Sequence, residues 1–354
     1  MTVPASAAVT PARGPSDYAI VKRRVREAGL LQRQPGFYIR SICAKLLLFA
    51  ACLAALVLFR NLWLQAAAAV ALAIVSGQLG FQLHDAGHHQ MFARSWKNVA
   101  VGLLTGDLLL GVSYGWWVDK HNRHHANPNH LDMDPDVNMV AIAYSPAQAS
   151  GRRGPLRWMA RRQAYLFFPL LLLLGWSMHV SSVIFLVEQR SRYRRRELAL
   201  LATHALLYAG LFVWLLGPWT ALLVIVIHQC CAGFYLALVF APNHKGMPQV
   251  DEASDLDFLR RQVLTSRNVR SHPLTDLWYG ALNYQIEHHL FPTISRNRVR
   301  EAHAIVREFC RERGIPYHEV SMLRSYVELL AFLHEVGAPL RARGRIAHAD
   351  VRRP

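Results

Sequence analysis

Acidic residues are scarce in this sequence, and their scarcity narrows the class of protein that it can encode. Lysine and arginine total 40 against 23 aspartate and glutamate residues, which gives a formal net charge of +17 at pH 7. Such a charge can indicate nucleic-acid binding. Here, however, the basic residues lie beside apolar segments, where they are typical of anchors at a membrane surface. The sequence also lacks a recognisable nucleic-acid-binding motif, so we expect no nucleic-acid partner.

Cysteine motifs and nucleotide-binding loops are missing as well. The five cysteines form no Cys-x-x-Cys pair, which argues against an iron–sulfur cluster, a thiolate zinc site or a disulfide framework. No Gly-x-Gly-x-x-Gly fingerprint for a flavin or nicotinamide cofactor is present. The sequence contains no Glu-x-x-His motif either, which excludes the carboxylate-bridged di-iron bundles.

What the sequence has in abundance is long apolar segments, which make up much of its 53% of hydrophobic residues. Four of these segments are long enough to cross a bilayer as helices, and they cover residues 41–59, 62–83, 198–216 and 219–241. Residues 98–118 contain Asp107 and several glycines, so we predict an interfacial or re-entrant helix there. The fold class is therefore an all-α, multi-pass integral membrane protein with about four transmembrane helices plus interfacial helices.

The charge pattern predicts how these segments are oriented. The arginine-rich loop 190–196 is expected to be cytoplasmic by the positive-inside rule. If the four segments cross, both flanks of residues 164–187 face the cytoplasm, so that segment must enter and return or lie in the interface. Pro169 favours a broken helix there. A full crossing by this segment would instead split the candidate site residues between the two sides of the membrane.

Three regions follow from this reading. Residues 1–40 form an N-terminal cytoplasmic segment, disordered up to about Ser16. Residues 41–241 form the membrane domain, and residues 242–354 form a helical cytoplasmic cap.

The most informative feature is three histidine clusters, each with spacings that place its members on one helix face. His84 and His88 are four residues apart in the first cluster. His121 precedes His124 and His125 by three and four residues in the second. In the third, Gln285 precedes His288 and His289 by the same intervals. Single histidine pairs are common on helix faces, but three clusters beside apolar segments indicate metal binding.

The number of imidazoles indicates two metal ions. The clusters supply seven, and His244 after the fourth apolar segment is a candidate eighth. An all-histidine dinuclear site at a membrane surface suggests iron that activates dioxygen against a hydrocarbon chain, although imidazole also accepts zinc or manganese. Metal-bound histidines need acceptors for their second nitrogen, and the candidates are Asp85, Asp119, Glu287 and one of Asp132, Asp134 and Asp136.

The segments HDAGH, KHNRHHANPN and NYQIEHHLFP together resemble the three histidine boxes of the membrane fatty acid desaturases. The third box opens with a glutamine, and in this it resembles the third box of the front-end and sphingolipid branch. The similarity extends from about residue 40 to residue 320, and it includes APNHKGM at 241–247 and CRERGIPY at 310–317.

This resemblance implies a desaturase that introduces a double bond into an acyl chain, carried by coenzyme A or by a lipid, with dioxygen and two electrons at a cytoplasmic di-iron site. The implied ligands are His84, His88, His121, His124, His125, His244, His288 and His289. Gln285 stands where other branches have a histidine, and we expect it to ligate weakly or through water, or to shape the site.

The HPGG haem motif of the fused cytochrome that many front-end members carry is absent. We therefore expect electrons from a separate ferredoxin or cytochrome with its reductase. The alternative function is an acyl or lipid hydroxylase on the same scaffold. A histidine-rich metal transporter is a second alternative, but transport sites are expected near the middle of the membrane, whereas these clusters lie at segment ends. Trp116 and Trp117 either line an acyl tunnel or belong to an interfacial aromatic belt, and the belt is the favoured interpretation.

Overall fold

The computed structural model describes residues 15–188 and 191–342. Within these residues the regular secondary structure is helical apart from one parallel pair of two-residue strands, β1 (Asn268–Val269) and β2 (Glu319–Val320), and one isolated bridge between His130 and Val250. The predicted all-α class is confirmed. The leader predicted to be disordered lies almost wholly outside the described residues, as does the end of the predicted cap.

Four helical segments are long and apolar enough to cross a membrane, as predicted. They are α2 (Pro35–Leu58), α3 (Leu62–Gly87), the continuous run Arg194–Leu216 and α11 (Pro218–His244). The run comprises α9 (Arg194–Ala205), the π-helical turn η2 (Leu206–Gly210) and α10 (Leu211–Leu216). Most of α2 and of the run is exposed at the surface of the protein, whereas about half of α3 and α11 is buried. These two helices therefore form the inner pair, and both extend past the predicted segments, each far enough to carry its histidines.

Two further helix pairs are sharply bent. Helices α4 (Ser95–Gly102) and η1 (Leu103–Leu110) meet α5 (Tyr114–Ala126) at 112°. The bend lies at Gly111, whose φ of +68° is one that glycine adopts readily. Helices α7 (Gly154–Leu171) and α8 (Leu174–Glu188) meet at 84° just after Pro169. The broken helix expected within residues 164–187 is therefore present, because proline removes a backbone donor and disrupts the helix.

The cap is assembled from both ends of the chain. Its C-terminal part contains five α-helices and a 3-10 turn: α12 (Phe258–Leu264), α13 (Pro273–Trp278), α14 (Gln285–Leu290), η3 (Arg296–Arg298), α15 (Val299–Glu312) and α16 (Met322–Val336). The N-terminal helix α1 (Asp17–Glu27) buries Val21 and Val25 in the same core cluster as Phe309 of α15. Helix α1, which lies within the predicted N-terminal segment, thus packs into the cap core.

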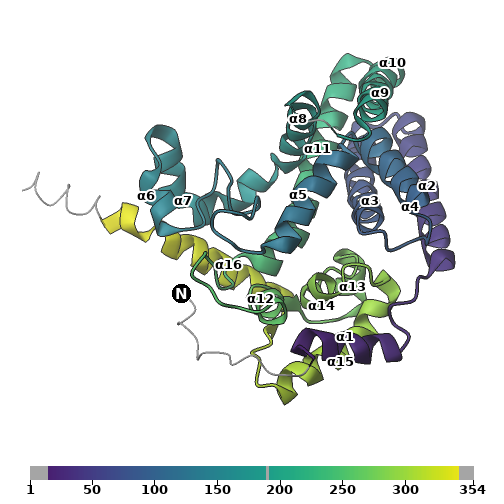
Figure 1. Cartoon of the computed structure of the whole chain (residues 1–354). Coiled ribbons are helices and arrows are strands. Elements are labelled where there is room, and N and C mark those ends of the chain that lie inside the picture. The colour runs from purple at the N-terminus through teal and green to yellow at the C-terminus, as the bar shows by residue number, and fades with distance from the viewer. Residues whose placement is uncertain (1–14, 189–190, 343–354) are drawn as a thin grey trace, which may run out of the picture.

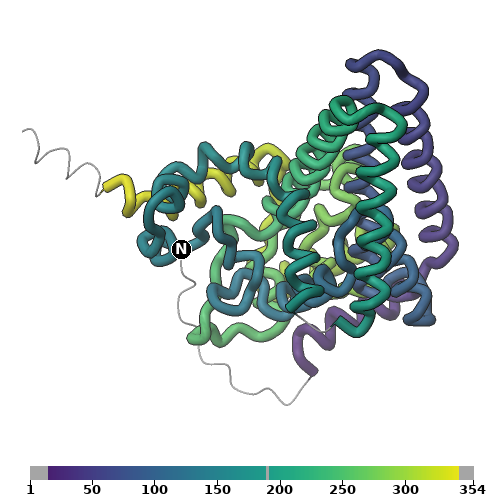
Figure 2. Tube along the Cα trace, turned by 90° about the horizontal axis from the view of Figure 1, so that it is seen from above, coloured from purple at the N-terminus to yellow at the C-terminus, as the bar shows by residue number. Residues whose placement is uncertain are grey.

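Helix α16 connects the cap to the membrane domain. Figures 1 and 2 both show it alongside α7, near the short helix α6 (Pro146–Gly151). Leu329 and Leu333 of α16 share a core cluster with Phe167 of α7 and Ala237 of α11. The amphipathic spacing of α15, with Val299, Ala302, Val306 and Phe309 all buried, is the pattern expected of a helix packed on one face.

The packing of α8 against α11 can be tested at Gly175 and Gly233, where the two helices are in close contact. A Cβ atom on Gly233 would lie 2.4 Å from the backbone nitrogen of Gly175. We expect Gly233→Ala to separate the two helices and to destabilise the protein by about 1–3 kcal/mol, measured as a lower thermal midpoint in detergent. The matched control is Gly210→Ala, because nothing lies within 4 Å of that site. Equal midpoints for the two variants would contradict the helix contact.

Candidate metal centre

The eight candidate histidines come from four helices that converge at the junction of the membrane domain and the cap (Figure 1). The C-terminal ends of α3 and α11 supply His84, His88 and His244. Helix α5 supplies the second cluster, and α14, the short helix of the cap, supplies His288 and His289. Most of these imidazoles are buried, and only His121 and His125 are partly exposed.

One group combines all three boxes. His84, His88, His121 and His288 can present ring nitrogens that all lie within 4.8 Å of one another. The Nε2 atoms of His84 and His288 are 3.1 Å apart, and those of His88 and His121 are 2.9 Å apart.

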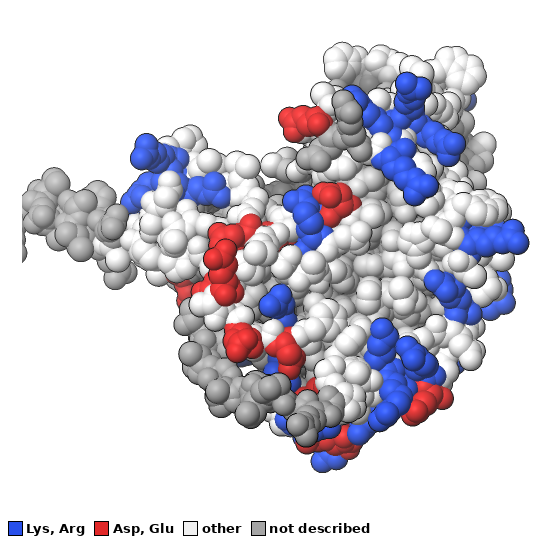
Figure 3. All heavy atoms as spheres, viewed as in Figure 1, with Lys and Arg blue, Asp and Glu red and all other residues white. Residues whose placement is uncertain are grey.

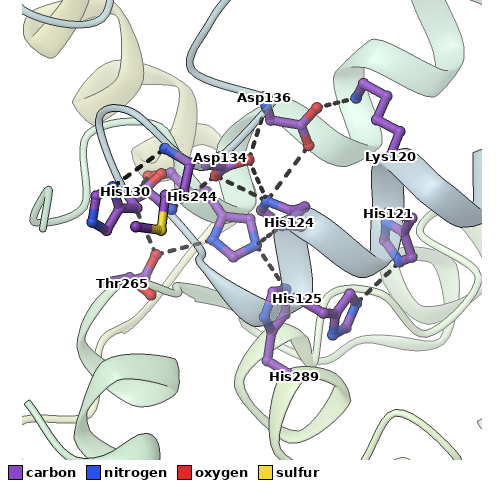
Figure 4. Close-up of polar contacts among 12 residues, drawn as sticks. Lys120, His121, His124, His125, His130, Asp134, Asp136, His244, Thr265 and His289 are labelled. Atoms are coloured by element: carbon purple, nitrogen blue, oxygen red, sulfur yellow. Dashed lines mark hydrogen bonds and ion pairs between the residues drawn. The ribbon is translucent and has the colours of Figure 1, made fainter. Parts of the chain in front are cut away.

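A second group combines His124, His244 and His289. The Nε2 atom of His244 lies 3.2 Å from that of His124 and 3.0 Å from that of His289. Figure 4 shows these three rings converging from α5, α11 and α14. The eighth imidazole, His125, lies between the groups. Its Nε2 is 3.0 Å from that of His121, and its ring stacks on His289 with centroids 4.1 Å apart.

In this second group, the Nδ1 atom of each histidine faces an oxygen atom that can accept a hydrogen bond but cannot donate one. His124 Nδ1 lies 3.0 Å from the Asp134 carboxylate, and His244 Nδ1 lies 3.0 Å from the Thr265 carbonyl. His289 Nδ1 donates to Gln262 Oε1 at 2.8 Å. The amide orientation of Gln262 is fixed because its Nε2 donates to the His125 carbonyl. Each Nδ1 therefore carries the proton, and each Nε2 presents a lone pair.

The Nε2 lone pair of His244 faces those of His124 and His289 at 3.2 and 3.0 Å, and such lone pairs repel unless a cation lies between them. For a metal–nitrogen bond of about 2.1 Å, two ligands of one ion lie roughly 3.0–3.4 Å apart, which matches the 3.2 and 3.0 Å separations in the second group. Burial lowers the pKa of His288 and of His289 well below the ordinary value. These imidazoles are therefore neutral at pH 7, the form that binds metals. The residues present fit a metal ion in each group.

The carboxylate behind His124 belongs to a wider polar network, which Figure 4 shows in part. Asp134 accepts from the backbone nitrogens of Asn129 and Asp136, both at 2.8 Å. Asp136 also forms an ion pair with Lys120, and this lysine holds the pKa of the Asp136 carboxyl below its usual range, against the opposing effect of burial. These contacts keep the carboxylates ionised and the His124 ring oriented.

The three other expected acceptors lie in different surroundings. Asp85 contacts His84 Nδ1 at 3.1 Å and also pairs with Arg296. Asp119 instead forms a largely exposed ion pair with Arg123 at 2.8 Å. Glu287 is fully buried but accepts from Asn268 and Tyr317, each at 2.7 Å, so its contacts stabilise the α14 backbone region and not an imidazole.

Gln285 lies against the second group. Its Nε2 is 2.9 Å from His244 Nε2, and its Oε1 accepts from Asn243 Nδ2 at 3.0 Å. An amide nitrogen has no free lone pair for a metal. The expected role of Gln285, to ligate weakly or through water or to shape the site, stays a prediction.

Sequence reasoning missed three residues that support the imidazoles, namely Gln262, Thr265 and Arg296. Gln262 and Thr265 contact the second nitrogens of His289 and His244, and Arg296 pairs with Asp85. None belongs to a repeated spacing, and Thr265 acts through its carbonyl. No sequence signal could have identified them.

An apolar pocket adjoins the first group. It is lined by α3, α8, α11 and the η1–α5 segment, including Gly80, Leu83, Val112, Trp117 and Leu236. Trp117 stacks on the ring of His121 with centroids 4.4 Å apart. The preference for an interfacial belt is therefore wrong for Trp117, because this side chain lies between the pocket and the imidazoles. The polar residues Ser76, His179, His228 and Gln229 line the same pocket.

The family model that matches this chain and the similar proteins reported below are all described as desaturases. Residues 61–321 match the family model described as fatty acid desaturase. An acyl-lipid (9-3)-desaturase of Physcomitrium patens is 30% identical over 312 residues, which cover 85% of this chain and 58% of that protein. A Delta(8)-fatty-acid desaturase of Helianthus annuus is 28% identical over 342 residues, covering 92% and 74%. A Delta(5) fatty acid desaturase of Caenorhabditis elegans is 29% identical over 311 residues, covering 84% and 68%. The chain thus spans less than two thirds of the moss protein.

The contact between Gln262 and His289 gives a test of the second group. Replacing Gln262 with leucine removes the acceptor for His289 Nδ1, so we expect metal affinity to fall by roughly 10- to 100-fold. The measurement is metal content after competition with a chelator. Gln262→Glu keeps an acceptor at the same position and should retain the metal. Unchanged retention in Gln262→Leu would show that this contact does not support a metal ligand.

Proposed function

Because this chain belongs to the fatty acid desaturase family, we propose that it introduces a double bond into a fatty acyl chain. The observation that carries the proposal is the position of the two imidazole groups, one of which adjoins an apolar pocket between α3, α8 and α11. The balanced reaction consumes one dioxygen, two electrons and two protons. It releases two waters as two adjacent carbons each lose a hydrogen.

We propose that His84, His88, His121 and His288 hold one iron ion. His124, His244 and His289 would hold the second, with His125 between the two. When bound, the iron pair would supply the activation of dioxygen by two added electrons. The protein fixes the rings through the acceptors on their second nitrogens, above all Asp85, Asp134 and Gln262.

The acyl chain, carried by coenzyme A or by a lipid, would lie in the apolar pocket. Trp117 bounds this pocket on the side of His121. A chain held there would exclude water, and its position along the pocket would decide which carbons face the metal-binding imidazoles. Double-bond position is thus a matter of where the pocket holds the chain.

We place the site on the cytoplasmic side. Helices α3 and α11 both end in the site, and each is preceded by another crossing segment. The arginines at the start of α9 then lie on the same side of the membrane as the site, as the positive-inside rule requires.

A separate electron donor, a ferredoxin or a cytochrome with its reductase, would dock on the cap. Lys and Arg side chains lie at its lower edge in Figure 3, with Asp and Glu side chains among them. The arginines Arg23, Arg307 and Arg311 of α1 and α15 are exposed, and each pairs with a glutamate. This surface would attract an acidic carrier.

The reaction is tested by the fatty-acid profile of a host that expresses the chain with a ferredoxin and its reductase. We expect a new unsaturated acid, with double-bond position determined by mass spectrometry, that disappears in His288→Ala because a proposed metal ligand is lost. The matched control is His334→Ala, since His334 is exposed on α16 outside the site. A hydroxy acid would instead identify the hydroxylase. Activity that survives in His288→Ala would contradict the proposed site.

Membrane orientation is tested by a reporter pair fused after Arg196, one active only in the cytoplasm and one only outside it. We expect the cytoplasmic reporter alone to be active, because the arginines of α9 resist translocation. Activity of the external reporter would reverse the topology and separate the clusters.

A further inference from the structure

The cap carries an apolar surface that its own core does not cover. In α13, Leu274 is 70% exposed and Leu277 is 66% exposed. In the first turn of α16, Leu323 is 74% exposed and Met322 is 43% exposed. Leucines this exposed are unusual in clusters on a surface that faces water.

The two helices present these side chains from adjacent positions. Strands β1 and β2, which precede α13 and α16, pair in parallel with Val269 opposite Val320. Further along the two helices, the hydroxyls of Tyr279 and Tyr326 lie 3.5 Å apart. Leu274, Leu277, Met322 and Leu323 therefore belong to one region, which we call the wedge surface.

The wedge surface lies beside the membrane helices α3 and α11, at a level before their histidine-bearing ends. The Leu277 carbonyl accepts from Gln78 of α3 at 2.9 Å, and the Trp278 carbonyl accepts from Tyr235 of α11 at 2.6 Å. Tyr326 of α16 donates to the Leu238 carbonyl of α11 at 2.8 Å. Gln78 precedes His84 by six residues, so α13 contacts α3 about 9 Å below its histidine end.

This surface continues the lipid-facing side of α3. Ile74 lies four residues before Gln78, on the same helix face, and is 41% exposed. Arg270 lies four residues before Leu274, and Arg324 follows Leu323; both are exposed, and Arg324 pairs with Glu328. Exposed leucines with arginines nearby in the chain are typical of an interfacial anchor, in which the guanidinium groups meet lipid phosphates.

We propose that α13 and the first turn of α16 insert the wedge surface into the phospholipid bilayer. The cap then contacts the membrane directly at this point. The proposal concerns the position of these helices and does not depend on the proposed reaction.

Insertion would also connect the bilayer to the third histidine cluster. Asp276 of α13 accepts from Asn283 Nδ2 at 2.8 Å and from the Tyr284 hydroxyl at 3.1 Å. These residues immediately precede α14, which carries His288 and His289. These contacts therefore connect α13 to the segment that leads into the helix carrying His288 and His289.

The test uses the full chain in phospholipid vesicles, with a fluorophore on a single cysteine at Leu277 or Leu323 after the five native cysteines have been replaced by alanine. Lipids that carry a nitroxide in the acyl chain and aqueous iodide serve as the two quenchers. We expect the lipid nitroxide to quench both positions and iodide to quench them about threefold less than an exposed site.

The matched control is a label at Phe258, which is also apolar and 46% exposed but lies in α12 against Tyr18 of α1. Iodide should quench this position freely. Iodide quenching at Leu277 equal to that at Phe258 would overturn insertion. Protection of Leu277 from both quenchers would overturn it too, because it would mean that a second protein copy covers the surface.

Discussion

The structure depends on which ring nitrogens the buried imidazoles direct toward one another. In the group formed by His124, His244 and His289, every Nδ1 proton is donated to an oxygen, so that the Nε2 lone pair of His244 faces those of His124 and His289 at 3.2 and 3.0 Å. Without a cation this arrangement is repulsive, and with one it is a ligand set. The acceptors behind the rings are therefore as necessary as the rings, because they decide which nitrogen is free to bind.

This requirement explains why the helices end where they do. Helices α3 and α11 continue past the apolar segments that cross the membrane, and their last turns bury His84 and His244 between the membrane domain and the cap. The bend at Gly111 directs α5 toward the same point, and α14 approaches from the other side. The apolar pocket lies between these membrane helices, so the organisation that assembles the imidazoles also places an apolar pocket beside them.

Sequence patterns predicted the membrane segments and the histidine clusters, but not how the clusters combine. Spacings of three and four residues show that side chains share one face of a helix, yet they say nothing of which helices meet. Neighbours such as His124 and His125, or His288 and His289, differ by about 100° around a helix, and the structure directs them toward different partners. The contacts of Gln262 and Arg296, and the packing of α1 on the cap, depend on tertiary structure and have no local signal.

Metal content combined with X-ray absorption of the purified protein tests the central claim most directly. The account predicts two irons per chain, each with a first coordination shell dominated by imidazole nitrogen, and no sulfur ligand. One metal per chain, or a shell dominated by carboxylate oxygen, would contradict the division of these histidines into two metal-binding groups.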